Sequence, residues 1–236
     1  KVKAPFYSNY NTIQEGLPWM CNYMIEWIGI FQSVDEIQNS PTQPFNPKPG
    51  DLKFKDQNKD GKIDGNDRVV VGGAYPDFIY AGGFNLFWKG FDMSAFFQGV
   101  QGTRFFVDRW GQVPFTQSTP PTKEFARNAW TETNPTNKYP AMYQDGYGPV
   151  TGTASTFFLE DASYLRLKNL VIGYTLQNLP QQLKIKDVRI YISCDNLITL
   201  TKYPPGADPE RLGVGRQRFA TYPQLKIFSA GLNVKF

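Results

Sequence analysis

The end of the chain alternates between apolar residues and residues that are small or polar. Between Gln224 and Phe236 the apolar positions are Phe228, Ala230, Leu232, Val234 and Phe236. Because alternate side chains of a β-strand point to opposite faces, this pattern predicts a strand with one apolar face. A strand of about ten residues that ends on an aromatic residue is typical of a membrane-spanning β-barrel, although the edge strand of a soluble β-sandwich has the same pattern.

Two more strands are predicted near the middle of the chain, joined by a tight turn. Residues 78–88 and 91–101 are rich in apolar and aromatic side chains, and only Lys89 and Gly90 separate them. Two residues that include a glycine form the commonest β-hairpin turn, because glycine readily adopts a positive φ. In the second of these strands one face can contact lipid and the other a water-filled lumen, since Phe91, Met93, Ala95 and Phe97 alternate with Asp92, Ser94, Phe96 and Gln98.

Further strands are predicted at residues 24–32, 163–175 and 187–197. In the last of these, one face is apolar and comprises Val188, Ile190, Ile192 and Cys194. A helix is predicted over residues 122–132, within the long connection from 102 to 161. Thr122 would cap this helix and Asn134-Pro135 would end it.

The predicted fold class is all-β, with about six strands joined by short turns and long loops. Such unequal connections are typical of an antiparallel transmembrane β-barrel, in which the long loops face the outside of the cell. A membrane barrel needs about eight or more strands to close. We therefore expect residues 1–236 to form the carboxyl-terminal portion of a larger barrel, with open strand edges that a missing part pairs. The opening at Lys1, with no initiator Met or signal peptide, fits this interpretation.

Composition excludes a helical membrane protein. The chain is 41% hydrophobic, 16% aromatic and 19% charged, with a mean hydropathy of −0.43. It has no apolar run of about eighteen residues, which a membrane helix requires. A transmembrane barrel and a soluble β protein both remain open, because in a barrel only alternate residues face lipid.

Charge and residue types exclude several other classes. The net charge is +4, and the 25 basic residues are scattered, which argues against a nucleic-acid partner. The chain has no histidine, so catalysis or metal ligation by histidine is excluded. Cys21 and Cys194 lie far apart in strand-like segments, and we expect two free, buried thiols rather than a disulfide.

An acidic segment within residues 51–70 has the spacing of an EF-hand calcium loop. The oxygen donors would be the side chains of Asp56, Asn58, Asp60, Asp64 and Asp67 together with the backbone carbonyl of Lys62. Asp67 replaces the usual Glu at the twelfth position, so a bound Ca²⁺ or Mg²⁺ would be held less tightly or with altered selectivity. The alternative is a turn held together by hydrogen bonds from its own Asp and Asn side chains.

Several of these motifs, in this order, resemble the SusC-like (RagA-like) family of TonB-dependent outer-membrane transporters. The residues that carry the resemblance are Trp27–Gln32, Gly50–Arg68, Gly72, Pro76, Gly90–Gly102, Ala162–Tyr174, Asp195–Leu197 and Phe236. The match covers the carboxyl-terminal part of the barrel, and the family's plug and TonB-contacting parts are not in this chain.

The resemblance implies a function and a set of partners. Such proteins import glycans or oligopeptides across the outer membrane under a SusD-like lipoprotein lid, using energy that the TonB system delivers through the missing amino-terminal part. Phe236 would be the signal for the barrel-assembly machinery and would contact outer-membrane lipid. Lumen-facing candidates are Asp92, Gln98, Arg189 and Asp195. Aromatic residues in the long loops would either contact the cargo or the lid, or simply hold the loops together: Trp110, Phe115, Trp130, Tyr139, Tyr143 and Tyr147.

Two rival functions are kept open. The first is a soluble β-rich module that binds carbohydrate or mediates adhesion and carries a calcium loop. The second is a glycan hydrolase, which the sequence disfavours because Glu160 and Asp161 are neighbours on a strand and point to opposite faces. A Gly-x-Ser-x-Gly nucleophile motif is also absent from the sequence. We therefore expect a transporter with no enzymatic activity.

Overall fold

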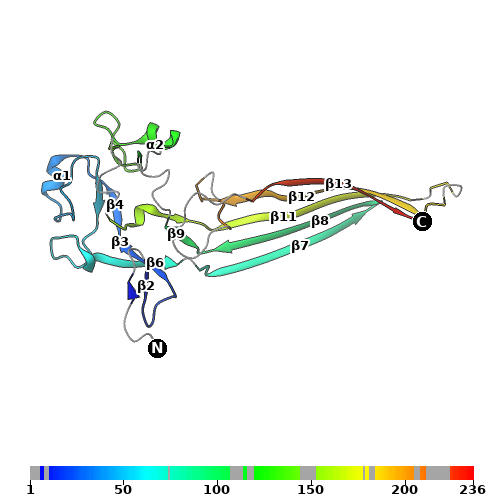
Figure 1. Ribbon diagram of the computed structural model, residues 1–236, viewed down its shortest axis with the longest axis horizontal. Helices are drawn as coiled ribbons and strands as arrows, with labels where there is room; N and C mark the ends of the chain where they lie inside the picture. The colour runs from blue at the N-terminus through cyan, green and yellow to red at the C-terminus, as the bar shows by residue number, and fades with distance from the viewer. Residues whose placement is uncertain are drawn as a thin grey trace. The chain divides into compact units, whose positions relative to one another are not determined.

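The structure, a computed structural model, divides the chain into two compact units (Figure 1). It describes residues 6–7, 11–73, 75–106, 114–115, 120–143, 153–177, 179–180, 184–204, 208–210 and 224–236. The first unit comprises the described residues up to Tyr75 together with those of Arg104–Glu160, and the second comprises those of Pro76–Thr103 and those between Asp161 and Phe236. No helix among the described residues combines the length and the apolar character needed to cross a membrane.

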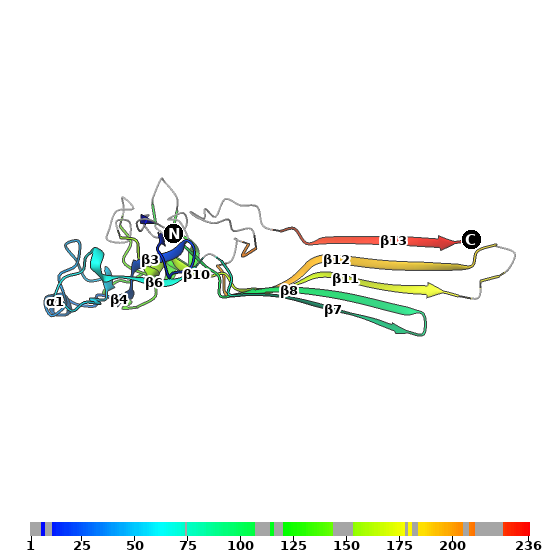
Figure 2. The ribbon, with the colours of Figure 1, turned by 90° about the horizontal axis from the view of Figure 1, so that it is seen from below.

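The second unit contains one antiparallel sheet of five strands, which we call the long sheet. Its strands are β7 (Phe78–Trp88), β8 (Phe91–Gln101), β11 (Tyr164–Leu176), β12 (Asp187–Thr201) and β13 (Ile227–Lys235). Their spatial order is β13-β12-β11-β8-β7, and both ribbon views show them side by side (Figures 1 and 2). All five were predicted from the sequence, and β12 extends four residues beyond its predicted end at Leu197.

The turn between β7 and β8 confirms the predicted hairpin. Lys89 and Gly90 both have a positive φ, of 47° and 87°. Two such residues in succession match the right-handed twist of the flanking strands. The backbone carbonyl of Gly90 also accepts a hydrogen bond from the amide of Thr175 at 2.8 Å, which ties the turn to β11.

One irregularity crosses the long sheet at Lys168. In β11 Leu167 pairs with Phe97 of β8, but Asn169 pairs with Phe96, so Lys168 is an extra residue. The register against β12 shifts at the same place, between Leu167 and Asn169. A β-bulge of this kind changes the face to which the residues beyond it point.

The first unit consists of short elements packed around a small apolar core. Strands β1 (Phe6–Tyr7), β2 (Asn11–Ile13), β3 (Cys21–Ile25) and β6 (Arg68–Gly73) form one sheet, and β4 (Trp27–Ile30) pairs with β5 (Leu52–Phe54). A further pair joins β9 (Arg104–Phe106) to β10 (Leu159–Asp161). The short helices are α1 (Val34–Gln38), η1 (Gly65–Asp67), α2 (Lys123–Asn128) and η3 (Thr156–Phe158). The core comprises Ile25, Ile30, Leu52, Phe54, Ile63, Trp130 and Phe158.

The strand predicted over residues 24–32 is not part of the long sheet. It is interrupted at Glu26, whose backbone carbonyl accepts from the amide of Lys55 at 3.0 Å while its carboxylate binds the Lys55 and Gln57 side chains. The two halves pair separately, β3 with β6 and β4 with β5. Among the described residues the long sheet therefore has five strands, and the segment 24–32, which was expected to be a further strand of the barrel, is not one of them.

The helix predicted over residues 122–132 is present but shorter. Thr122 caps it as expected, since its hydroxyl accepts a hydrogen bond from the amide of Phe125 at 3.1 Å. The helix ends at Asn128, because Ala129 is extended and the next amide, of Trp130, bonds the carbonyl of Tyr139. The predicted stop at Asn134-Pro135 lies beyond the true end. Cys21 and Cys194 are both free thiols; Cys21 is buried and Cys194 is half-buried.

Gly50 holds the loop 141–143 against the core of the first unit. It has a φ of +95°, and a Cβ placed there would lie 2.5 Å from Cε3 of Trp130 and 2.7 Å from Cβ of Ala141. Its carbonyl accepts the amide of Ala141 at 2.9 Å, and the neighbouring Asp51 accepts a hydrogen bond from the hydroxyl of Tyr143.

We predict that Gly50→Ala lowers the free energy of unfolding of the first unit by about 3 kcal/mol, the upper part of the usual range for overpacking. The matched control is Gly16→Ala, because Gly16 has a similar φ of +87° but nothing within 4 Å of the new methyl group. The control isolates the backbone cost, about 1 kcal/mol. Thermal unfolding followed by tryptophan fluorescence measures both, and equal losses in the two variants would contradict the packing explanation.

Candidate functional site

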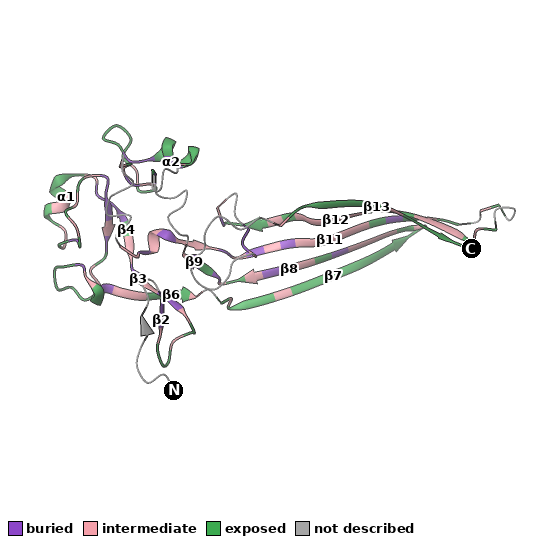
Figure 3. Cartoon of the chain, viewed as in Figure 1, coloured by how far each residue is buried: buried purple, intermediate pink, exposed green. Residues whose placement is uncertain are grey.

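The long sheet has one continuous apolar face. Its register aligns apolar residues from all five strands in rows; one row is Trp88, Phe91, Tyr174, Ile190 and Leu232, and the next is Leu86, Met93, Ile172, Ile192 and Ala230. These side chains are uncovered, as Ile192 is 54% and Leu232 60% exposed, and most of β7 and β13 is exposed along its length (Figure 3). An apolar surface of this extent is unstable against water but suits the hydrocarbon region of a membrane.

The opposite face is polar and its charges are paired. Arg189 on β12 donates from Nε to Oδ1 of Asp92 on β8 at 2.8 Å, across the intervening strand β11. This pair is possible because Gly173 of β11 lies between them, where a Cβ would be 2.6 Å from Asp92 Oδ1. Nearby, Asn169 donates to Asp195 at 2.8 Å. Three of the predicted lumen-facing residues, Asp92, Arg189 and Asp195, thus lie on this face.

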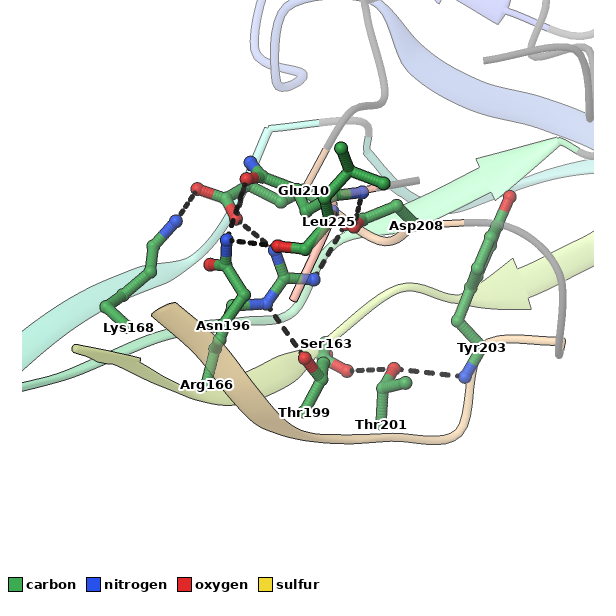
Figure 4. Close-up of polar contacts among 11 residues, drawn as sticks. Ser163, Arg166, Lys168, Asn196, Thr199, Thr201, Tyr203, Asp208, Glu210 and Leu225 are labelled. Carbon is green, nitrogen blue, oxygen red and sulfur yellow. Dashed lines mark hydrogen bonds and ion pairs between the residues drawn. The ribbon is translucent and has the colours of Figure 1, made fainter. Parts of the chain in front are cut away.

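A buried charge cluster lies on the polar face near Tyr164, the first residue of β11 (Figure 4). Arg166, which pairs in register with Gln98, the fourth predicted lumen residue, is only 2% exposed. Its guanidinium donates to Asp208 at 2.8 Å, to Glu210 at 2.6 Å and to the hydroxyl of Thr199 at 2.9 Å. Such charge-assisted hydrogen bonds are about twice as strong as neutral ones.

The cluster is electrically balanced and joins distant parts of the chain. Lys168 binds the second carboxylate oxygen of Glu210, so two cations face two carboxylates. Asp208, 4% exposed, also accepts the backbone amides of Glu210 and Gln224 at 2.9 and 2.8 Å. Burial alone would raise the pKa of Asp208, but the hydrogen bonds from Arg166, Gln224 and Glu210 outweigh it and lower that pKa below its usual value.

Sequence reasoning missed this cluster. Arg166 and Lys168 alternate with leucines in an apolar strand, a signal that could have identified them as inward-pointing. Their partners, however, lie 42 and 44 positions away in a connection whose path no local pattern predicts.

The predicted metal loop is closed by its own hydrogen bonds. Asp56 accepts the amides of Lys59 at 2.6 Å and Gly61 at 2.9 Å, and Asp60 accepts that of Lys62 at 3.0 Å. Asn58 and Asp64 accept in the same way from the amides of Asp60 and Asn66. These bonds match the alternative of a self-tied turn, yet each carboxylate oxygen of Asp56 and Asp60 accepts one hydrogen bond and keeps a lone pair that could bind a cation.

Asp67 has a structural role in this loop. It is completely buried, and its carboxylate accepts the amides of Gln57 at 2.8 Å and Asp64 at 2.7 Å. Within the described residues, no three Cys, Asp or Glu side chains converge closely enough to form a metal centre. Binding of Ca²⁺ or Mg²⁺ by this loop therefore stays a prediction.

The loop aromatics mostly hold the first unit together. Trp130 lies in the core and donates from Nε1 to Gln32 at 2.9 Å, Tyr139 packs on Phe125 and Tyr143 binds Asp51. Burial, together with the hydrogen bond to the Asp51 carboxylate, raises the pKa of the Tyr143 hydroxyl above its ordinary value. Phe115 is 41% exposed, whereas Trp110 and Tyr147 lie outside the described residues.

The chain is similar to known proteins in both sequence and structure. No family model matches the chain. It is 30% identical over 229 residues to the TonB-dependent receptor P3 of Formosa agariphila, covering 91% of this chain and 22% of that protein. It is 27% identical over 194 residues to the TonB-dependent receptor SusC of Bacteroides thetaiotaomicron, covering 81% of this chain and 18% of SusC. In structure it is similar to a chain of the RagAB peptide transporter, with a TM-score of 0.69 at 26% identity, over 98% of this chain and 24% of that one.

Over almost its whole length the chain is similar to SusC-like TonB-dependent receptors in sequence and in structure. It spans about a fifth of the length of the curated relatives it matches. Proteins of this family are outer-membrane β-barrels and not enzymes, which confirms the predicted location, fold class and lack of catalytic activity. The role of Phe236 as an assembly signal stays a prediction; its side chain is 86% exposed.

We predict that Asp208→Asn destabilises this receptor by about 3 kcal/mol at pH 7, because it leaves the buried Arg166 with one carboxylate partner. The folded pKa of Asp208 is lower than the unfolded value of about 3.9, so its contribution is complete above about pH 4 and is lost as the pH falls through the folded pKa. The difference in unfolding free energy between wild type and variant should therefore shrink at pH 3. Asp187→Asn, which removes an ion pair of 4.0 Å at a more exposed site, is the control and should cost less than about 1 kcal/mol.

Calcium titration of the purified receptor tests the acidic loop. If it binds Ca²⁺, Asp60→Asn should weaken the affinity by about tenfold, since the ligand loses a charge but keeps its shape. Asp35→Asn, an acidic residue in α1, should leave the affinity unchanged. Absence of a calorimetric signal with the wild type at millimolar Ca²⁺ would leave the loop a purely structural turn.

Proposed function

We propose that the full-length receptor imports glycans or oligopeptides across the outer membrane. The observation that carries this proposal is the two-faced long sheet, apolar on one side and lined with paired charges on the other. A wall of this kind separates lipid from a water-filled path. The similarity to SusC and to the RagAB peptide transporter supports transport as the activity.

Energy and a lid are part of the same proposal. The curated relatives are named TonB-dependent receptors, so we propose that the TonB system drives uptake through a part of the protein outside this chain. We also propose a SusD-like surface lipoprotein as the partner, together with the barrel-assembly machinery during insertion. RagAB, to which this chain is similar, is described as a peptide importer, which keeps oligopeptides beside glycans as cargo.

The soluble binding module is the weaker alternative. It would place Trp88, Ile192 and Leu232, all more than half exposed, in water on a contiguous apolar face. At about 25 cal/mol for each Å² of apolar surface, exposure of a whole sheet face costs many kcal/mol. No observation on the described residues favours that alternative.

Uptake by living cells tests the proposal. A strain that lacks the chromosomal gene should regain uptake of labelled glycan or oligopeptide mixtures when it is complemented with the full-length gene. We expect complementation to fail without TonB and to be strongly reduced without the proposed SusD-like lipoprotein. Uptake that persists without TonB would exclude energised transport, and the mixture that is taken up identifies the cargo class.

A further inference from the structure

Residues 208–210, in the connection between β12 and β13, lie over the polar face of the long sheet. The last pair of β11 and β12 is Tyr164 with Thr201. Asp208 and Glu210 come after that end in sequence, yet they bind Arg166 and Lys168, which lie two and four positions back along β11. The described part of this connection at 208–210 therefore lies beside the sheet and not beyond its end (Figure 4).

The face on which it lies is the polar one. Arg166 is in register with Gln98 and Thr199, and this row lies on the same side as the Asp92–Arg189 pair. Because Lys168 is the extra residue of the bulge, its side chain reaches the same carboxylate as Arg166 instead of pointing to the lipid side.

Two described segments of the connection, residues 208–210 and 224–225, are held together at this point. Asp208 and Glu210 accept from the backbone amide and the side-chain amide of Gln224, at 2.8 and 3.2 Å. Next to it, Asn196 of β12, with a φ of +52°, donates to the carbonyl of Leu225 at 3.1 Å. Residues 208–210 are thus joined to residues 224–225, and both segments are joined to the sheet.

Exposure separates two roles within the cluster. The Arg166 and Asp208 side chains are 3% and 4% exposed and are sealed from solvent, whereas Lys168 and Glu210 are 20% and 22% exposed. Arg166 therefore holds Asp208 and Glu210 in place from the buried side of the cluster. The Lys168–Glu210 pair forms the edge that solvent and a solute on the polar face can reach.

We propose that residues 208–210 and 224–225 of the β12–β13 connection form a fixed part of the conduit wall, with Arg166 as a positioning residue and Lys168 lining the path. This inference rests on the proposed transport function. It predicts that a bulky group at position 168 obstructs passage, and that loosening Arg166 exposes position 168.

The test uses the full-length receptor in cells, with Cys21, Cys194 and any cysteine outside this chain replaced by alanine. Lys168→Cys is treated with thiol reagents of increasing size, and energised uptake is measured. The largest reagent should lower the maximal rate by about tenfold, as obstruction of a path does, while the smallest should leave it nearly unchanged. The control is Lys202→Cys, an exposed position at the start of the same connection, where no reagent should lower uptake.

A second measurement separates positioning from mere stability. Arg166→Lys keeps the charge but lacks the planar fork that binds two carboxylates. Combined with Lys168→Cys and compared at equal amounts of assembled receptor, it should raise the rate at which the introduced thiol reacts by about tenfold, the effect expected for loss of one charge-assisted hydrogen bond. If this variant fails to assemble, Gln224→Ala, which removes one of the side-chain bonds between the two ends, should raise the same rate to a smaller extent.

The outcomes distinguish the inference from the function on which it rests. Full uptake by Lys168→Cys carrying the largest reagent would overturn the inference, and so would equal inhibition at positions 168 and 202. An unchanged reaction rate of the thiol at position 168 in both the Arg166 and Gln224 variants would remove the positioning role. Failure of the unlabelled wild type to accumulate cargo, by contrast, would contradict the proposed transport function itself.

Discussion

The long sheet has one apolar and one polar face only because the alternating side chains of all five strands are aligned on the same two sides. Each strand alternates with a period of two, so a single extra residue in one strand moves every later side chain to the other face. In β11 that extra residue is Lys168. Because of it, Leu165 and Leu167, which precede Lys168 in the strand, point to the apolar face together with Leu200 and Ile198 of β12. Without the bulge these leucines would line the polar face and Arg166 would point into lipid, where an isolated charge costs several kcal/mol.

The same irregularity explains why the charges are found together. It places two basic residues of β11 on one side at one level, and the connection after β12 supplies two carboxylates at that level. A buried cation is tolerated only when it is paired and hydrogen-bonded, and here each of these four groups has at least one partner of opposite charge. The fold thus uses a local defect of the strand to bind a distant segment of chain.

Patterns within one strand predicted the strands and their faces, because alternation and tight-turn chemistry are local properties. The Lys89-Gly90 turn and the apolar rows of β12 and β13 were correct for that reason. The interruption at Glu26, the early end of α2 at Asn128 and the Arg166 cluster were not predicted. Each depends on hydrogen bonds to residues outside the predicted element itself, such as Lys55, Tyr139 and Asp208. The acidic loop shows an intermediate case, since its spacing is local but serves a turn and a cation site equally well.

The glycines of the long sheet determine the register in which its strands pair, which the apolar pattern does not. If β13 slipped by two residues along β12, every apolar side chain would still face lipid, so hydrophobicity does not oppose that error. At the observed register the Tyr191 ring lies over Gly231, where a Cβ would come within 2.3 Å of Cζ. A slip by two would place Ser229 or Asn233 under the ring, and the strand would be pushed away. The apolar residues determine which side of a strand faces the membrane, and single glycines determine the register in which the strand pairs with its neighbour.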